Sequence, residues 1–332
     1  MIGQIRNDGL KKKGLKIMGH MKGKLLFQFH RGDSWQAAEH CFVDLSDTYK
    51  RMPFSEHHLE ILSKSRVAIF GVGSGGSGLA DRLVRAGVAG FELIDPDRLS
   101  VENISRHLCD LTDLGRYKVK AVRDRILLVN PNARVRTYAY DVFKRPNALE
   151  QIISSANLII GATDDAPTQL RINWFSAKRC IPALFPSCYE LAKGGEILYT
   201  VGRKTNICLE CWMGRDDKPE VKGKMDYSTA QSLRDYKGEP ALYAAISFIT
   251  DVAAQYAIAL LLRKEDCELA RLIDLKRNLL LIGGALGEGY YFFKKPFHFI
   301  TPIIKEPWKE CTTCQVFRSL DAEASARQKK KR

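Results

Sequence analysis

The sequence predicts an α/β protein built on a doubly wound, mostly parallel sheet with helices on both faces. Three observations lead to this prediction. Residues 65–95 have the pattern of a strand, a glycine-rich turn, a helix and a second strand that ends on an acid. Short apolar runs then alternate with segments of helical periodicity, which is typical of strands joined by crossover helices. With 332 residues, 45% of them hydrophobic, the chain can also bury a large core.

The unit at residues 65–95 has the pattern of a nucleotide-binding turn. Val67–Phe70 is an apolar run of strand type, and Leu79–Ala86 carries apolar residues at helical spacing. A second strand, Phe91–Ile94, ends on Asp95, at about the distance where an acid binds ribose hydroxyls. Glycines allow a tight turn and let backbone N–H groups and a helix N-terminus approach a phosphate. The turn fits G-x-G-x-x-G and contains Gly71, Gly73, Ser74, Gly75 and Gly76. By itself it also fits an ordinary strand-to-helix connection or a dinucleotide oxidoreductase.

The same periodicities place the later elements. Helices are predicted over residues 118–128, 148–153, 168–178 and 241–262. Strands are predicted over residues 135–140, 158–163, 181–185, 194–201 and 279–282, with a last one within 297–304. In the N-terminal region we expect a strand at Lys24–His30, then a turn and a helix cap at Ser34 that precedes Trp35–Cys41. The long helix near the C-terminus is most simply core and homodimer interface.

Charge and hydropathy narrow the class of protein. The formal net charge is +14, and lysine runs near both ends supply part of it. We interpret these runs as solvated tails, with attraction to an acidic protein partner or to nucleic acid as the alternative. Nucleic acid is disfavoured because the sequence has no basic groove interleaved with aromatic residues. No apolar run reaches the ~18–20 residues of a membrane span, and residues 1–25 lack a signal-peptide core, so a cytoplasmic protein without membrane contact is expected.

Four of the nine cysteines form two C-x-x-C pairs. Each pair can present two thiolates to one metal ion, and two pairs complete a closed Cys₄ zinc site. Ordinary cysteines or redox pairs are the alternatives. The two pairs are Cys208 with Cys211 and Cys311 with Cys314.

The residues that follow the glycine turn carry a family resemblance. Asp95-Pro96-Asp97 is followed by Asn103, Arg106 and His107, then by Lys118, and Thr163-Asp164 ends a later strand. In this order and spacing the chain resembles the ubiquitin-activating-enzyme-like adenylyltransferases, the ThiF/MoeB/HesA superfamily. That superfamily includes the activators of the sulfur carriers used for molybdopterin and thiamin synthesis. The resemblance covers roughly residues 49–314. Within the superfamily, the chain is more similar to bacterial accessory ubiquitin-like systems than to the enzymes of housekeeping sulfur activation.

The resemblance implies a Rossmann-like adenylation domain that uses ATP and Mg²⁺. Arg106 and Lys118 then supply positive charge to the phosphates, and Asp164 holds Mg²⁺ and aligns the reactants. Asp95 binds the ribose, and Asn103 orients the nucleotide. The residues of the glycine turn contact the phosphates. The family also has two cysteine pairs in this arrangement, which favours structural Zn²⁺ that ties the C-terminal segment to the domain.

The resemblance also implies boundaries and one further arginine. Residues 1–45 form an N-terminal extension of unknown role, 46–318 the adenylation domain and 319–332 a basic tail. A crossover loop at about 214–240 passes over the substrate's C-terminal tail. In the family, an arginine from a short N-terminal helix reaches the partner subunit's nucleotide site, and Arg51 is the candidate here; a surface arginine is the alternative.

The expected function is therefore ATP-dependent adenylation of the C-terminal carboxylate of a ubiquitin-like or sulfur-carrier protein with a flexible tail. A conjugating enzyme or a sulfurtransferase is the expected further partner. We expect no obligatory enzyme thioester, since Cys267 is the one cysteine between the two pairs and Cys188 lies outside the expected loop.

Three alternatives stay open. An adenylating dehydratase of the same superfamily predicts ATP use that RNA stimulates. A dinucleotide oxidoreductase leaves Arg106, Lys118 and Asp164 unexplained. A non-catalytic scaffold predicts lost nucleotide residues, yet this chain retains them.

Overall fold

The computed structural model divides the chain into two units, Met1–Pro53 and Phe54–Arg332. The division falls later than the predicted end of the extension at residue 45. The crossover loop from residue 215 on, and the tail beyond residue 319, lie outside the described residues. The structure describes residues 2–4, 15–21, 24–31, 34–37, 41–43, 45–189, 192–202, 205–214, 241–284, 295–304, 308–316 and 319.

The first unit is built from short antiparallel strands. β1 (Ile2–Gln4) pairs with β5 (Cys41–Val43), and η1 (Leu45–Tyr49) follows. β2 (Leu15–Met21), β3 (Lys24–Arg31) and β4 (Ser34–Ala37) form a three-stranded sheet in that order. The strand predicted at Lys24–His30 is confirmed, but the helix expected after Ser34 is wrong. Arg31 pairs with Ser34 and His30 with Trp35, so the chain turns straight back along β3 and forms a hairpin.

The second unit contains an eight-stranded sheet in the order β13-β12-β11-β10-β9-β6-β7-β8. The strands from β6 to β10 pair in parallel, and β11, β12 and β13 add an antiparallel extension. The predicted doubly wound, mostly parallel sheet is confirmed. The strands are β6 (Arg66–Phe70), β7 (Gly90–Ile94), β8 (Arg134–Tyr138), β9 (Leu158–Gly161), β10 (Ala183–Cys188), β11 (Gly194–Thr200), β12 (Leu279–Gly283) and β13 (Phe299–Ile300).

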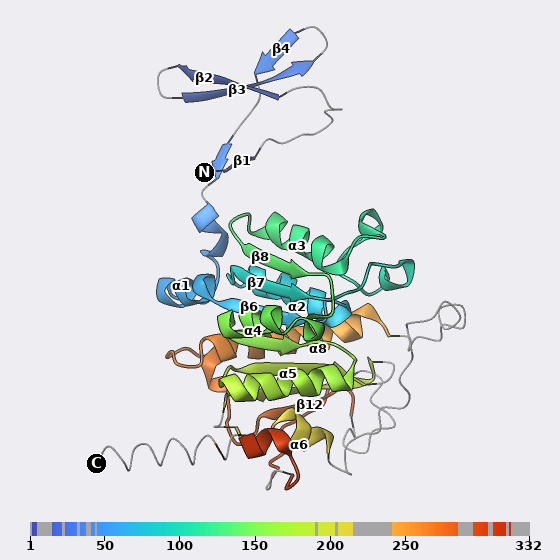
Figure 1. Ribbon diagram of the computed structural model, residues 1–332. Helices are drawn as coiled ribbons and strands as arrows, with labels where there is room; N and C mark the ends of the chain where they lie inside the picture. Colours follow the sequence, from blue (N-terminus) through green and yellow to red (C-terminus); the bar gives the residue numbers. More distant parts are fainter. Residues whose placement is uncertain are drawn as a thin grey trace. The chain divides into compact units, whose positions relative to one another are not determined.

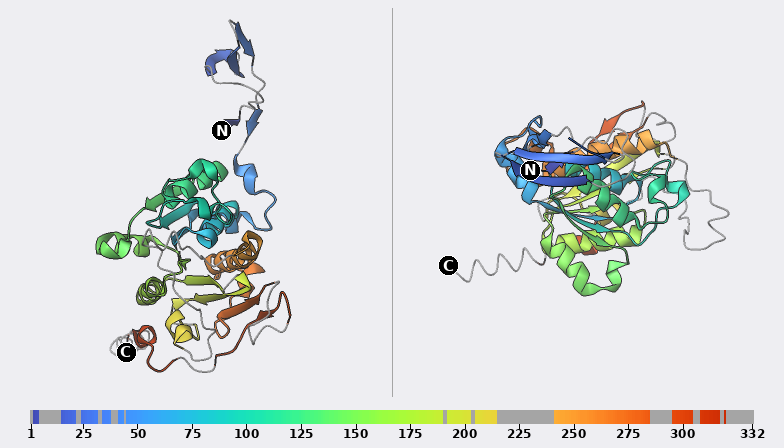
Figure 2. Two further views of the ribbon diagram at one scale, coloured as in Figure 1. Left: turned by 90° about the vertical axis from the view of Figure 1, so that its right-hand side faces the viewer. Right: turned by 90° about the horizontal axis from the view of Figure 1, so that it is seen from above.

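Helices cover both faces of this sheet (Figures 1 and 2). The ends of α3, α4, α5 and α8 agree with the predicted helices to within a few residues, α2 begins earlier than predicted, in the glycine turn itself, and α1 and α6 were not predicted. The α-helices are α1 (Glu56–Lys64), α2 (Ser74–Arg85), α3 (Lys118–Val129), α4 (Pro146–Ser155), α5 (Ala166–Arg179), α6 (Leu209–Met213) and α8 (Tyr243–Leu261). Short 3₁₀ turns are η2 (Val101–Asn103), η3 (Leu111–Asp113), η4 (Val142–Lys144) and η7 (Leu269–Leu272).

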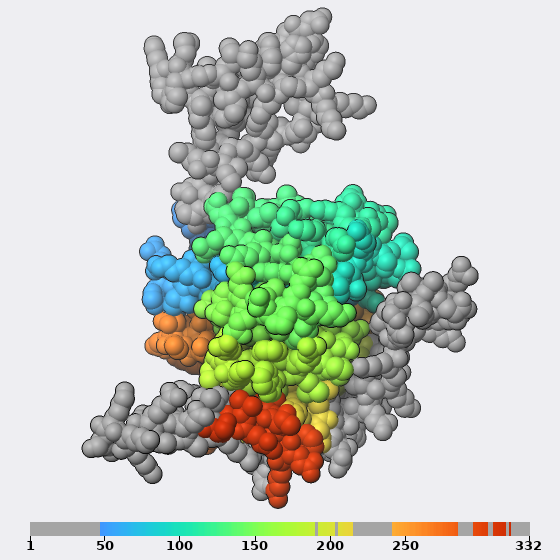
Figure 3. All heavy atoms as spheres, viewed as in Figure 1, coloured from blue at the N-terminus to red at the C-terminus, as the bar shows by residue number. Residues whose placement is uncertain are grey.

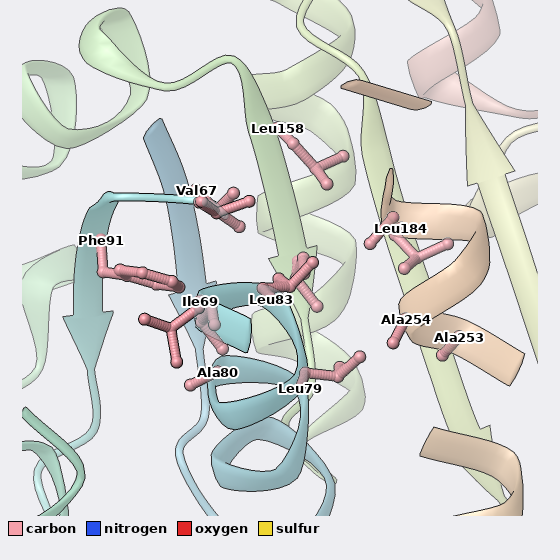
Figure 4. Packing of buried hydrophobic residues seen from close by; sticks show 14 of the residues in the cluster. Val67, Ile69, Leu79, Ala80, Leu83, Phe91, Leu158, Leu184, Ala253 and Ala254 are labelled. Atoms are coloured by element: carbon pink, nitrogen blue, oxygen red, sulfur yellow. The ribbon is translucent and has the colours of Figure 1, made fainter. Parts of the chain in front are cut away.

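The side chains of β6 point alternately to the two faces of the sheet and belong to two separate layers of the core. Val67 and Ile69 belong to the cluster that includes residues of α2, α3 and α8 (Figure 4). Ala68 and Phe70 belong to the cluster on the opposite face, with residues of α4 and α5. Successive side chains of a strand point to opposite faces, so a central strand that is apolar throughout needs helices on both sides.

α8 is a core helix by its contacts. Its length and apolar composition would suffice to cross a membrane, but half of that stretch is buried inside the protein. The helix packs against α2, β10 and β11, and Ala253 and Ala257 are completely buried. Small residues allow the close approach of α2, so packing against the sheet accounts for the apolar composition of this helix.

Candidate functional site

A pocket of about 710 Å³ lies at the carboxyl ends of the parallel strands. The chain runs from β6 through β7 to β8 on one side of the sheet, then returns to place β9 and β10 on the other. Loops that leave β6 and its two neighbours therefore diverge, and open α/β sheets bind ligands in the crevice at this point. The pocket brings together most of the sequence-predicted site residues: Gly71, Gly73, Ser74, Asp95, Asn103, Arg106, Lys118 and Asp164.

The glycines of the turn have different surroundings. Gly71 adopts φ +87°, and a Cβ there would lie 2.6 Å from the carbonyl oxygen of Ala162. Gly73 caps the N-terminus of α2, and a Cβ there would meet nothing within 4 Å. Close packing against the end of β9 thus requires glycine at position 71. At position 73 the absence of a side chain leaves open space that belongs to the pocket.

Gly75 and Gly76 were predicted to contact phosphate, yet neither belongs to the pocket lining. A Cβ on Gly76 would lie 1.9 Å from the carbonyl oxygen of Gly71, and one on Gly75 would lie 3.9 Å from the Thr250 hydroxyl on α8. A side chain at either position would therefore point toward protein, although the backbone N–H groups of both glycines belong to the first turn of α2 and can still donate to a ligand there.

Asp95 fastens the end of β7 to the glycine turn. Its carboxylate accepts the backbone N–H of Val72 at 2.8 Å and that of Asp97 at 2.9 Å. Burial raises the pKa of this carboxyl group, and the charge of Lys118 opposes the rise. A carboxylate has about four lone-pair sites, so Asp95 can accept a ribose hydroxyl beside these two bonds.

Two cations and an amide lie on the next wall. Lys118 is the first residue of α3, its side chain is 12% exposed, and its Nζ lies 2.9 Å from Oδ2 of Asp97. Asp97, an exposed loop acid, also lines the pocket, as the partner of Lys118. Arg106 is half-buried. Asn103 accepts the N–H of Ser100 at 3.1 Å through its side-chain oxygen, and so caps η2.

The two acids after β9 take different roles. Asp165 caps α5, because its carboxylate accepts the N–H of Thr168 at 2.8 Å. Asp164 is exposed and lines the pocket. Of the pair, Asp164 is thus the carboxylate available to a metal ion, and the pocket residues fit the expected Mg²⁺, which prefers one or two carboxylates with phosphate oxygens.

Aromatic side chains also line the pocket, and the sequence analysis did not identify them. Tyr140 and Phe143 belong to the lining together with Arg171 of α5, whose guanidinium carbon lies 4.2 Å from the centre of the Phe143 ring. Flat apolar surface and positive charge in one pocket suit a ligand with an aromatic ring and phosphates. The signal was available, because these aromatic residues follow β8 at the same edge of the sheet.

The four paired cysteines meet in one cluster. Their sulfur atoms all lie within 4.8 Å of one another, with neighbouring Sγ atoms 3.3–3.8 Å apart. A tetrahedron of 2.3 Å Zn–S bonds has sulfur atoms about 3.8 Å apart. The donor set and its geometry therefore fit a structural zinc ion.

A carboxylate also links the two C-x-x-C segments directly through hydrogen bonds. Glu210, between the cysteines of the first pair, accepts bonds from the backbone N–H and hydroxyl groups of Thr312 and Thr313, at 2.6–3.0 Å. Asn173 of α5 donates to the Thr313 hydroxyl and accepts the Leu209 N–H. Figure 3 shows the C-terminal segment, in red, against α6, in yellow. The cluster therefore ties residues 308–316 to the sheet domain.

Three further predicted residues lie apart from this chemistry. Cys188 ends β10, is exposed, and is not among the described residues that line the pocket. Cys267 is half-buried beside the α8 core cluster. Arg51 is exposed in the first unit, and its catalytic role stays a prediction.

Comparison with known proteins gives a family and a fold. The model of the ThiF family matches residues 47–281. A sulfur carrier protein adenylyltransferase of Thermus thermophilus is 30% identical over 163 residues, which cover 48% of this chain and 59% of that protein. A tRNA threonylcarbamoyladenosine dehydratase of Escherichia coli is 28% identical over 198 residues, which cover 59% of this chain and 72% of that protein.

Among solved structures, Escherichia coli MccB with ATP superimposes with a TM-score of 0.58 at 16% identity, over 78% of this chain and 69% of that one. This likeness concerns the fold. The chain spans about three fifths of the length of the sulfur-carrier relative.

Proposed function

The chain belongs to the ThiF family, and from this membership we propose that it adenylates the C-terminal carboxylate of a ubiquitin-like or sulfur-carrier protein. The observation that carries the proposal is a single pocket that combines the glycine turn, two cations and an exposed acid at the carboxyl edge of the sheet. Relatives named as sulfur carrier adenylyltransferases support the same chemistry.

The reaction is limited by electrostatics, because a carboxylate must approach a polyphosphate. A carboxylate oxygen bonds to the α-phosphorus of ATP, the bond from that phosphorus to the bridging oxygen breaks, and pyrophosphate leaves with the electron pair. Arg106 and Lys118 neutralise the phosphate oxygens, and backbone N–H groups at the start of α2 donate to them. The ion pair with Asp97 holds Lys118 at the pocket, so its charge is in place before the nucleotide arrives.

Two metal ions complete the proposal. Asp164 would hold Mg²⁺, which shields charge on the phosphates. The four clustered cysteines would hold Zn²⁺ in a closed structural site. Neither Cys188 nor Cys267 is assigned a thioester, and the acyl adenylate passes to another protein.

The partners follow from the same chemistry. We propose a carrier protein whose flexible C-terminal tail reaches the pocket, and a sulfurtransferase or conjugating enzyme that takes the product. A cytoplasmic homodimer is proposed as the working form, in which Arg51 reaches the nucleotide of the partner subunit.

An RNA-stimulated dehydratase is the second candidate. It is favoured by the relative named as a tRNA threonylcarbamoyladenosine dehydratase, of which the match covers 72%. The two candidates differ in what stimulates ATP use, a carrier protein in the first case and RNA in the second. An oxidoreductase is disfavoured by the pair of cations beside the glycine turn.

ATP–pyrophosphate exchange tests the proposal, with purified protein, Mg²⁺ and candidate carrier proteins encoded near its gene. We expect exchange that depends on the carrier's C-terminal tail and falls by about 10²–10³ in Lys118→Ala or Asp164→Ala, the scale of losing one charge-stabilising group. Lys120→Ala, an exposed lysine on the same helix, is the matched control and should retain exchange. Turnover at the wild-type level in Lys118→Ala would contradict the assignment, and stimulation by tRNA alone would favour the dehydratase.

A further inference from the structure

His107 is a buried titratable group to which the proposed reaction assigns no role. It ends the Asn-x-x-Arg-His run, is 6% exposed, and lines the pocket. Its Nε2 lies 2.9 Å from the carbonyl oxygen of Val72, and its Nδ1 lies 3.0 Å from the backbone nitrogen of Cys109. Both ring nitrogens are thus engaged with backbone groups.

These two partners define the protonation state of the ring. The Val72 carbonyl can only accept a hydrogen bond, so Nε2 carries the proton. The Cys109 N–H can only donate, so Nδ1 must be unprotonated. The structure therefore requires the neutral Nε2–H tautomer, and a second proton on the ring would break the bond to Cys109.

The bond to Val72 acts on the glycine turn. The Val72 N–H is held by Asp95 at 2.8 Å, and the Val72 carbonyl is held by His107. Peptide units are planar and trans, so these two bonds fix both planes that flank Val72. The second plane contains the N–H of Gly73, the residue that borders open space in the pocket. The imidazole therefore sets the direction of a donor that faces the ligand.

We infer that His107 is a positioning residue, whose neutral ring holds the glycine turn in the conformation that binds the phosphates, and whose protonation weakens nucleotide binding because a ring N–H set against the Cys109 N–H displaces the ring from the Val72 carbonyl. The inference rests on the proposed function, because it takes the ligand of the pocket to be a nucleotide. Neither the family match nor the named relatives assign a role to this residue.

The charged groups around His107 agree with this role. Burial lowers the pKa of His107, and the nearby charge of Lys118 lowers it further, whereas the hydrogen bond to the Val72 carbonyl and the charge of Asp113 of η3 oppose the shift. Asp95 faces the same Val72 peptide, and burial keeps the pKa of the Cys109 thiol at about 12, so that thiol stays neutral. The ring therefore stays neutral below its ordinary pKa of about 6.5. The stability that the neutral ring gives the fold is present above that pKa, and it is lost as the pH falls from there through the lower pKa of the ring in the folded protein.

Calorimetric binding of ATP with Mg²⁺ between pH 5.5 and 8 tests the inference in the wild type, His107→Gln and His107→Ala. At pH 8 we expect His107→Ala to bind about tenfold more weakly, because a buried carbonyl loses its donor. His107→Gln should restore most of the affinity, since its amide supplies an N–H. As the pH falls below 6.5 and through the lowered pKa of the His107 ring, the wild type should lose progressively more affinity than His107→Gln, up to about tenfold.

The comparison of the wild type with His107→Gln isolates the ring, because the ATP phosphates, Asp95 and Lys118 titrate in both proteins. Thermal unfolding at pH 8 identifies a variant that fails to fold. Equal loss of affinity at acid pH in the two proteins would overturn the inference while leaving ATP binding intact. An Nδ1–H tautomer, read from the ring nitrogens by NMR, would also overturn it without reference to ATP. If the wild type binds no ATP at any pH, the proposed function fails and the inference fails with it.

Discussion

Glycine serves two separate purposes in the turn after β6. Gly71 and Gly76 approach backbone atoms so closely that no side chain fits, whereas Gly73 borders open space. The backbone of Gly73, φ −76° and ψ −151°, lies outside the left-handed region that favours glycine. A methyl group at this position would meet no protein atom within 4 Å and would occupy room that a ligand needs.

This contrast gives a matched pair of variants. Gly73→Ala should retain the thermal stability of the wild type and weaken ATP binding by about tenfold or more, since its methyl group overfills the occupied pocket. Gly76→Ala should lose about 3 kcal/mol of unfolding free energy, at the upper end for overpacking, because the clash is with backbone. Calorimetry and thermal unfolding of both variants check the prediction. A destabilised Gly73→Ala protein with unchanged affinity would contradict the assignment of open space to the ligand.

At the scale of elements, the short helix α6 and the C-terminal segment are joined twice. The cysteine cluster offers a metal-dependent link, and Glu210 offers a metal-independent one through Thr312 and Thr313. Glu210 is half-buried, and these hydrogen bonds lower the pKa of its carboxyl group against the effect of burial. The segment should therefore resist release when only one link is lost.

Removing both links tests this arrangement. We expect Glu210→Ala to lower the unfolding free energy by about 2 kcal/mol, since two threonines lose their acceptor, and we expect a chelator to destabilise this variant more than the wild type. Glu60→Ala, at an exposed glutamate that pairs with Lys64 on the surface, is the control and should change little. Protease cleavage after residue 300 and thermal unfolding, each with and without chelator, provide the measurements. Equal sensitivity of the wild type and Glu210→Ala to chelator would show that the carboxylate adds no second link.

At the scale of the whole molecule, the second unit contains both described core clusters and every residue that lines the pocket. Fold stability and nucleotide binding should therefore reside in one part of the chain. The first unit consists of short antiparallel strands with their own pairing, which suits a role in recognising a partner or substrate.

Truncation tests this division of labour. A protein that begins at Phe54 should unfold cooperatively and bind ATP within about threefold of the full chain, less than 1 kcal/mol, because its core and pocket are complete. Carrier-dependent pyrophosphate exchange should fall by more than ATP affinity does, since the proposed arginine and the first unit are lost. Arg51→Ala in the full chain separates these two causes. A truncated protein that fails to bind ATP would show that the first unit completes the nucleotide site.

Much of the fold follows from local patterns. Apolar runs of four to six residues, helical spacing between them and the terminal acid at residue 95 predict a doubly wound, mostly parallel sheet, because buried parallel strands and their helices leave distinct periods in a sequence. The first unit was predicted less well. A polar residue such as Ser34 can cap a helix or follow the turn of a β-hairpin, and the local sequence does not distinguish the two.

The sequence alone determined the doubly wound sheet, the edge at which its ligand site lies and the two cysteine pairs, because strand ends, glycine turns and C-x-x-C spacing are local features of the chain. Tertiary packing, by contrast, determined which glycines line the pocket, that Tyr140 and Phe143 line it too, that His107 holds the Val72 carbonyl, and that Glu210 links the two cysteine pairs. Each of these depends on residues distant in sequence that meet through packing of the sheet and its helices, and no local period records such contacts.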